Sequence, residues 1–159
     1  MKSILMAACL LGLSFSALAD GKSDCRAAAG SYLTGTVVSG PNFASGQMLN
    51  GVELSHTHVS LQSDQDGQTY DVAMDNVFAS GYDSAGENVP YPLSSIQPGD
   101  RLQLCGQPYS SGLGIHWVHT NCGARPTRKQ PNGWVKKVNS DGSVSGNYEA
   151  NTEYCQLWP

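Results

Sequence analysis

Charged residues are scarce in this chain. Asp, Glu, Lys and Arg make up 14% of its 159 residues, against roughly 25% in ordinary soluble domains. Together with 18 glycines and 8 prolines, this composition excludes a coiled coil, a collagen and a disordered acidic tail. Glycine and proline at these levels favour many turns, so the composition indicates an extracytoplasmic, β-rich domain.

Several familiar motifs are also missing. The chain has no phosphate-binding loop, no dinucleotide fingerprint and no Gly-x-Ser-x-Gly nucleophile elbow. Asp64 and Asp66 begin a segment that looks like a calcium loop, but position 75 is Asp where an EF-hand needs Glu. A hairpin turn is the simpler interpretation. The sequence therefore names no reaction.

Long hydrophobic runs are absent after the first residues. Lys2 precedes an apolar stretch over residues 4–15, which is shorter than the 18 or more residues of a membrane-spanning helix. Ala17-Leu18-Ala19 supplies a small-x-small cleavage signal. The sequence predicts a Sec-type signal peptide over residues 1–19, cleaved after Ala19, and a periplasmic or secreted protein without a membrane span. The alternative, lipidation at Cys9, needs cleavage only a few residues into the apolar stretch.

Basic residues are few and unevenly placed. Without residues 1–19 the chain has 8 basic and 13 acidic residues, a formal charge of −5, which opposes strong binding to nucleic acids or anionic membranes. Five of the eight basic residues gather in one segment: Arg125, Arg128, Lys129, Lys136 and Lys137. This segment is either an anion-binding patch or a solvated loop.

Four cysteines remain after the predicted signal peptide. They are Cys25, Cys105, Cys122 and Cys155, and in an oxidising compartment four cysteines predict two disulfides. Three pairings are possible. Pairing Cys25 with Cys105 and Cys122 with Cys155 is preferred because it ties both chain ends to the central sheet. A cysteine zinc site is disfavoured, since no Cys-x-x-Cys pair occurs.

The remaining pattern is mainly that of strands. An alanine-rich segment predicts a short helix over 23–33, and a turn at 140–143 predicts a C-terminal hairpin. Alternating or β-branched residues predict five strands, over 35–39, 54–62, 69–74, 101–105 and 113–119. We therefore expect one disulfide-stabilised domain over 20–159, mainly β. It would be a small OB-like five-stranded barrel with a short N-terminal helix and a C-terminal hairpin extension, with a sandwich as the alternative.

All four histidines lie in two short stretches of the chain. Imidazole is a common ligand of transition metals and an acid or base near neutral pH. His58, His116 and His119 are therefore candidate ligands of zinc or another divalent metal, although no cofactor is specified. Residues three apart in a strand point to opposite faces, so His116 and His119 act together only if a bulge or turn intervenes near Val118. A structural or solvent-exposed role is the competing interpretation.

The segment from Gly114 to His119, followed by Asn132-Gly133-Trp134, resembles a family of small bacterial secreted or periplasmic proteins, domain-of-unknown-function family 3465. That family carries His-Trp-Thr-His followed by Asp-Gly-Trp, and here the first motif reads His-Trp-Val-His. The resemblance covers about residues 35–138. The family has no established activity, so the resemblance implies a fold and a compartment rather than a function.

Three functions fit these residues. The first is a non-enzymatic binding module in which Trp117, Asn121 and Trp134 hold an extracytoplasmic ligand: a saccharide, an anionic small molecule or a protein. The alternative is a small His-dependent or metal-dependent hydrolase of the phosphodiesterase or nuclease type. In it His116 and His119 are catalytic and Arg125 stabilises negative charge. Histidines that converge on one point would favour the hydrolase. A secreted effector acting through its surface is a third possibility.

Overall fold

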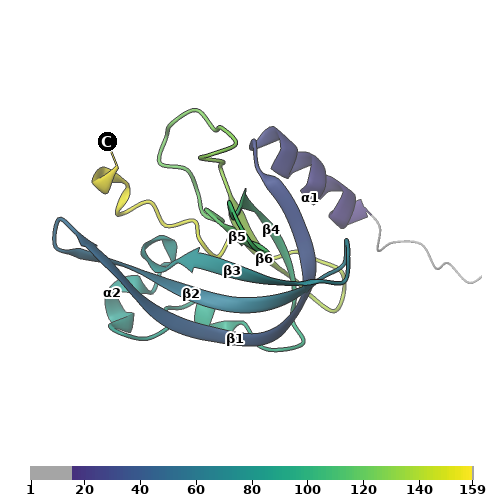
Figure 1. The fold of residues 1–159 in the computed structure, drawn as a ribbon, viewed down its shortest axis with the longest axis horizontal. Coiled ribbons are helices and arrows are strands. Elements are labelled where there is room, and N and C mark those ends of the chain that lie inside the picture. The colour runs from purple at the N-terminus through teal and green to yellow at the C-terminus, as the bar shows by residue number, and fades with distance from the viewer. Residues whose placement is uncertain (1–15, 159) are drawn as a thin grey trace, which may run out of the picture.

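A computed structural model describes residues 16–158, and the chain is mainly β (Figure 1). The predicted signal peptide, residues 1–19, lies outside the described residues except for the four that begin the first helix. The elements in chain order are α1 (Ser16–Ala27), β1 (Ser31–Leu49), β2 (Val52–Ser63), β3 (Thr69–Asp75), η1 (Asn76–Phe78), α2 (Tyr82–Ala85), η2 (Leu93–Ser95), β4 (Arg101–Pro108), β5 (Gly114–His116), β6 (Trp134–Val138) and η3 (Cys155–Leu157).

Five strands form a closed, barrel-like ring. The hydrogen-bonded order is β1-β2-β3-β5-β4, with β4 pairing back onto β1, and β6 lies outside the ring on β4. Strands β3 and β5 run parallel, and every other pair is antiparallel. The connection from β3 to β4 carries the short helices η1, α2 and η2. This arrangement confirms the predicted OB-like five-stranded fold.

Strand β1 is long and irregular, and it pairs with two neighbouring strands. Its first residues pair with β4, and from Gly35 onward it pairs with β2. The register on β2 shifts at three points, and such irregularities bend a strand. At one of them Gly40 has a φ of 94°, and a Cβ there would lie 2.6 Å from the carbonyl oxygen of His58. Glycine therefore permits the irregularity at this point of the β1–β2 pairing.

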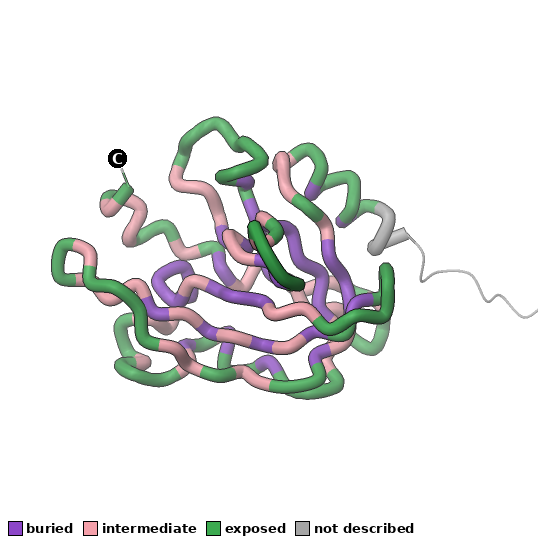
Figure 2. The backbone as a smooth tube through the Cα atoms, in the orientation of Figure 1, coloured by how far each residue is buried: buried purple, intermediate pink, exposed green. Residues whose placement is uncertain are grey.

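The core fills the inside of the ring. In β2, Thr57, Val59 and Leu61 are buried while the residues between them are half-buried, as the predicted alternation requires. Val72 and Met74 of β3 meet them from the next strand. Figure 2 shows this alternation of buried and partly buried positions along the sheet. Because the inward face is fixed in this way, the outward face of β2 and β3 is fixed as well.

Several predicted elements differ from the structure in their bounds. The strand expected over 35–39 is the much longer β1, Ser31–Leu49. The helix expected over 23–33 is Ser16–Ala27, because β1 already begins at Ser31. The strand expected over 113–119 is only Gly114–His116, because the chain turns at the next residue. The C-terminal hairpin is β6 with an isolated bridge between Val138 and Val144. Among residues 16–158, no helix has the length and apolar character to cross a membrane.

Two disulfides fasten the ends of the chain. Cys25 in α1 is bonded to Cys105 in β4, with Cα atoms 5.4 Å apart, and Cys122 to Cys155, with Cα atoms 5.2 Å apart. This is the pairing that the sequence analysis preferred. The first bridge is fully buried beneath Trp134. Two disulfides in a chain of this size are typical of an oxidising, extracytoplasmic environment.

Removing the buried bridge should weaken the fold. We expect the Cys25→Ala/Cys105→Ala double variant to lose roughly 2–5 kcal/mol of unfolding free energy, because the bridge closes a long loop in the unfolded chain. Urea denaturation followed by circular dichroism measures this loss. The matched Cys122→Ala/Cys155→Ala variant, whose bridge spans 33 rather than 80 residues, should lose less. Equal stability of the first variant and the wild type would contradict the expectation.

Candidate functional site

The outer face of β2, β3 and β5 gathers histidines and aspartates. His56 and His58 alternate with the buried residues of β2, so they point outward. In β3, Asp75 pairs across from His56, and Asp71 lies across from Gly114 of β5. His116 lies two residues after Gly114 and so points to the same face. Strands from three parts of the chain therefore bring these side chains together.

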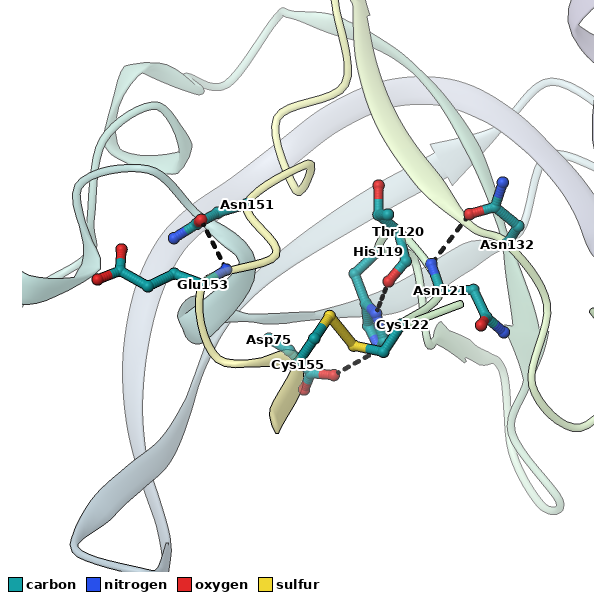
Figure 3. Close-up of a disulfide and its surroundings, with 9 residues drawn as sticks. All are labelled: Asp75, His119, Thr120, Asn121, Cys122, Asn132, Asn151, Glu153 and Cys155. Atoms are coloured by element: carbon teal, nitrogen blue, oxygen red, sulfur yellow. Dashed lines mark hydrogen bonds and ion pairs between the residues drawn. A yellow bond between two sulfur atoms is a disulfide. The ribbon is translucent and has the colours of Figure 1, made fainter. Parts of the chain in front are cut away.

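A turn at Trp117 adds the fourth histidine to this face. Trp117 has a φ of 53°, a left-handed conformation that is rare for a bulky residue. The turn ends β5, and His119 then reaches Asp75, as Figure 3 shows. The sequence analysis required a turn or bulge near Val118 for His116 and His119 to act together, and the structure has one at the preceding residue. Backbone conformations of this kind cluster at functional sites.

The Asp75 carboxylate joins two of the histidines. Its Oδ1 lies 2.5 Å from Nε2 of His56, and its Oδ2 lies 3.1 Å from Nε2 of His119. Burial alone would raise the pKa of Asp75, but the hydrogen bonds with His119 and His56 outweigh it and hold the pKa well below its usual range. The same hydrogen bond to Asp75 raises the pKa of His56. Asp75 is therefore ionised and pairs with both rings.

His119 is fixed within the protein. Its side chain is 5% exposed, and its ring stacks on Phe78 with centroids 3.8 Å apart. Nδ1 lies 2.9 Å from the Thr120 carbonyl oxygen, and Nε2 faces Asp75. Both ring nitrogens are engaged, so His119 positions Asp75 and the loop rather than offering a nitrogen to a ligand.

A second carboxylate, that of Asp71, contacts two side chains at the other end of this face. Nδ1 of His58 lies 3.0 Å from both oxygens of Asp71, and the Tyr109 hydroxyl donates to the same carboxylate at 2.5 Å. Burial and Asp71 together raise the pKa of Tyr109. A Cβ at Gly114 would lie 2.2 Å from the Tyr109 ring, so glycine lets that ring lie over the sheet. His116 meets the ring edge-on at 5.4 Å, and burial lowers the pKa of His116.

An aromatic pocket of about 190 Å³ opens beside this face. Its lining residues are Asp75, Phe78, Trp117, His119, Asn121, Cys122, Ala124, Gln130 and Trp158. Nε1 of Trp117 and Oδ1 of Asn121 are buried with no hydrogen-bond partner among the described residues. The Asn121 side-chain amide donates to the Gln130 carbonyl oxygen at 3.1 Å, which fixes its orientation. Two of the residues that line the aromatic pocket, Trp117 and Asn121, therefore each have a buried polar atom without a hydrogen-bond partner among the described residues.

The other predicted site residues lie elsewhere. Trp134 is buried against Tyr32 beside the Cys25–Cys105 bridge, so the structure does not bring it to the pocket. Arg125 lies on an exposed loop, one residue from the pocket-lining Ala124. Among residues 16–158, no three His, Cys, Asp or Glu side chains stand in the arrangement of a held metal ion.

The sequence analysis missed several contributors to these sites, among them His56, Asp71, Asp75, Phe78 and Trp158. For the first three a signal was present. His56 alternates with the apolar residues of its strand, and Asp71 and Asp75 alternate with those of the next strand, so the strand period predicts an outward orientation for all three. Phe78 and Trp158 had no such signal, because a helix turn and a disulfide-held terminus bring them to the pocket.

Comparison with known proteins gives no further guide to this site. No protein-family model matches the chain, and no curated protein or solved structure matches it. The geometry of the site is therefore the basis for assigning a function.

A buried acid lies behind the face. Glu149 is fully buried, and neither carboxyl oxygen has a hydrogen-bond partner among the described residues. Its backbone carbonyl accepts a hydrogen bond from the amide of Thr120 at 2.9 Å. Burial, and then the nearby negative charge of Asp75, raise the pKa of Glu149 well above its usual range. The native protein therefore binds this proton more tightly than the unfolded chain does.

Glu149 should make the protein less stable as the pH rises. A carboxyl whose pKa is raised in the folded state stabilises most below its ordinary pKa and loses that contribution at higher pH. Glu149→Gln keeps the side chain neutral, so we expect the variant to exceed the wild type in unfolding free energy at pH 8 but not at pH 4. Urea denaturation at both pH values tests this. A gap that does not change between them would contradict the account of Glu149.

Asp75 should control the titration of His56. In Asp75→Asn we expect the pKa of His56 to fall, because the hydrogen bond and the negative charge that raise it are lost. Proton NMR titration of the histidine ring resonances measures this pKa directly. Asp64→Asn is the control, since Asp64 pairs with Arg101 instead. An unchanged His56 pKa in Asp75→Asn would contradict the observed pairing.

Proposed function

We propose that this protein is a non-enzymatic, extracytoplasmic module that binds a small ring-containing ligand in the aromatic pocket. The observation that carries the proposal is a pocket walled by Phe78, Trp117 and Trp158, in which two lining residues, Trp117 and Asn121, each have an unpaired buried polar atom. An unpaired buried polar group costs free energy, and a ligand that pairs with it recovers that cost. Aromatic walls favour the flat faces of sugars and planar rings.

The position of the pocket supports the proposal. OB-like folds bind oligosaccharides and oligonucleotides on the face of their second and third strands, and Asp75, at the end of β3, lines this pocket. The net negative charge of the chain disfavours nucleic acids as ligands. The exposed basic loop, with Arg125, Arg128 and Lys129, borders the pocket at Ala124 and Gln130. A saccharide or small anionic ligand suits this combination best.

The disulfides and the N-terminal sequence together support the compartment that we propose. We propose that residues 1–19 are a Sec-type signal peptide, cleaved after Ala19, and that the mature protein is periplasmic or secreted. The motif resemblance to domain-of-unknown-function family 3465, whose members are secreted or periplasmic, supports this proposal. We propose membership of that family on the same motifs.

The pocket proposal is tested by ligand-observed NMR. Saturation-transfer experiments with methyl α-glucoside, glucuronate and glucose 6-phosphate should show transfer from the wild type to at least one of them. In Trp117→Ala we expect affinity to fall about tenfold, since an aromatic platform contributes about 1–3 kcal/mol per stacked ring. Met48→Ala is the control, because Met48 is exposed and outside the pocket. Undiminished binding to Trp117→Ala would contradict the proposal.

A second candidate function is a hydrolase of the phosphodiesterase type. The observation that favours it is the opposite displacement of two histidine pKa values on one face, upward for His56 and downward for His116. Such a split suits one acid and one base. If the protein hydrolyses bis(4-nitrophenyl) phosphate, His116→Ala should abolish turnover. Unchanged turnover in that variant would exclude His116 as the base.

A further inference from the structure

We propose that the Cys122–Cys155 disulfide is a redox switch that controls the shape of the aromatic pocket. The intact bridge holds Trp158 in the pocket wall, and reduction of the bridge by a dithiol releases Trp158 and opens that wall. The effect on ligand binding rests on the proposed function, because it requires that the pocket binds a ligand. The effect on Trp158 does not.

The bridge is part of the pocket itself. Cys122 lines the pocket, as does Asp75 (Figure 3), and Cys155 lies three residues before Trp158, which lines the pocket as well. The Trp158 ring stacks on the ring of Phe78, another lining residue, with centroids 5.6 Å apart. One covalent bond therefore joins the loop on one side of the pocket to the segment that carries an aromatic wall.

The other ties of the C-terminal segment end before Trp158. The Tyr154 hydroxyl donates to Asp83, which holds the chain as far as Tyr154. After it, the amide of Trp158 donates to the carbonyl oxygen of Cys155 at 3.1 Å, a bond within the segment. Among the described residues, no hydrogen bond joins residues 156–158 to a more distant part of the chain. The bridge is therefore the bond that fixes Trp158 at the pocket.

The two disulfides differ in their exposure. Cys25 and Cys105 are both 0% exposed, whereas Cys122 and Cys155 are both partly exposed. Thiol–disulfide exchange begins when a thiolate reaches a sulfur atom, so its rate depends on access. A dithiol in solution should therefore reduce the bridge at the pocket while the buried bridge keeps the fold closed.

The reaction is an ordinary exchange with a dithiol reductant. One thiolate of the reductant attacks a sulfur of the bridge, which releases the other cysteine as a thiolate. The second thiol of the reductant, as a thiolate, then breaks the mixed disulfide. Two electrons and two protons pass to the protein, so Cys122 and Cys155 become thiols and the reductant becomes a disulfide. Oxidation by a protein disulfide of the same compartment reverses these steps.

Reduction should weaken the pocket without removing it. The Trp158 side chain is already 38% exposed, and without the bridge it no longer faces a bound ring. Trp117 and Asn121 keep their places, since the Asn121 amide donates to the Gln130 carbonyl oxygen and that contact does not involve the bridge. A ligand therefore loses one stacking surface, and we expect its affinity to fall about tenfold.

Cysteine trapping tests which bridge is reduced first. The native protein is treated with dithiothreitol, its thiols are blocked with iodoacetamide at successive times, and peptide mass spectrometry locates the label. We expect Cys122 and Cys155 to be labelled well before Cys25 and Cys105. Labelling of all four cysteines at one rate, or of the buried pair first, would overturn the proposal.

Acrylamide quenching of tryptophan fluorescence tests the release of Trp158 without any ligand. The Stern–Volmer constant should be higher in Cys122→Ala/Cys155→Ala than in the oxidised wild type. In a Trp158→Phe background, the matched control, loss of the bridge should leave the constant unchanged. Equal quenching with and without the bridge would overturn the proposal. Circular dichroism verifies folding, and if the double variant does not fold, wild type reduced with dithiothreitol replaces it.

Ligand binding is tested by saturation transfer to methyl α-glucoside, glucuronate and glucose 6-phosphate. Dithiothreitol should weaken binding to the wild type about tenfold and should not change binding to Cys122→Ala/Cys155→Ala, which has no bridge to reduce. Equal affinity of the oxidised and reduced wild type would contradict regulation by the bridge. If the oxidised wild type binds none of the three sugars, the proposed function fails, whereas the quenching result still decides whether the bridge holds Trp158.

Discussion

The pairing of Asp75 with His119 is the contact on which the functional face depends. Asp75 ends β3, and His119 follows β5, so the contact ties the loop after β5 to the sheet. The same carboxylate orients His56 on β2. His119 in turn stacks on Phe78, which lines the aromatic pocket. The Asp75 carboxylate thus joins the outer face of β2, β3 and β5, the histidine face, to the pocket beside it. Its negative charge is tolerated at a half-buried position because both of its oxygens are paired.

Local pattern made much of the fold predictable. In β2 and β3 the alternation of polar and apolar residues has the strand period, and the structure buries the expected face of each. The turn at residues 64–68 joins them as expected. Both disulfides form in the preferred pairing because α1 and η3 lie at the two ends of the chain and each meets a partner near the sheet. The five strands then close into a ring because β4 pairs back onto β1.

The site was less predictable because it depends on departures from regular structure. Trp117 takes a positive φ that no propensity favours, and this turn is what lets His116 and His119 approach the same face. Trp158 reaches the pocket through the disulfide at Cys155, and Trp134, expected to bind ligand, packs into the interior beside the other disulfide. Such contacts are set by tertiary packing rather than by neighbouring residues, so a sequence pattern does not reveal them.

The histidine face and the aromatic pocket therefore both depend on the contact between Asp75 and His119. A double-mutant cycle tests this contact most directly. Unfolding free energies of the wild type, Asp75→Asn, His119→Gln and the double variant give the coupling between the two side chains. The account predicts a coupling of about 1–3 kcal/mol, because contacting residues in one hydrogen-bond network do not act additively. Additive effects, within about 0.5 kcal/mol, would show that the two residues do not interact and would contradict the account.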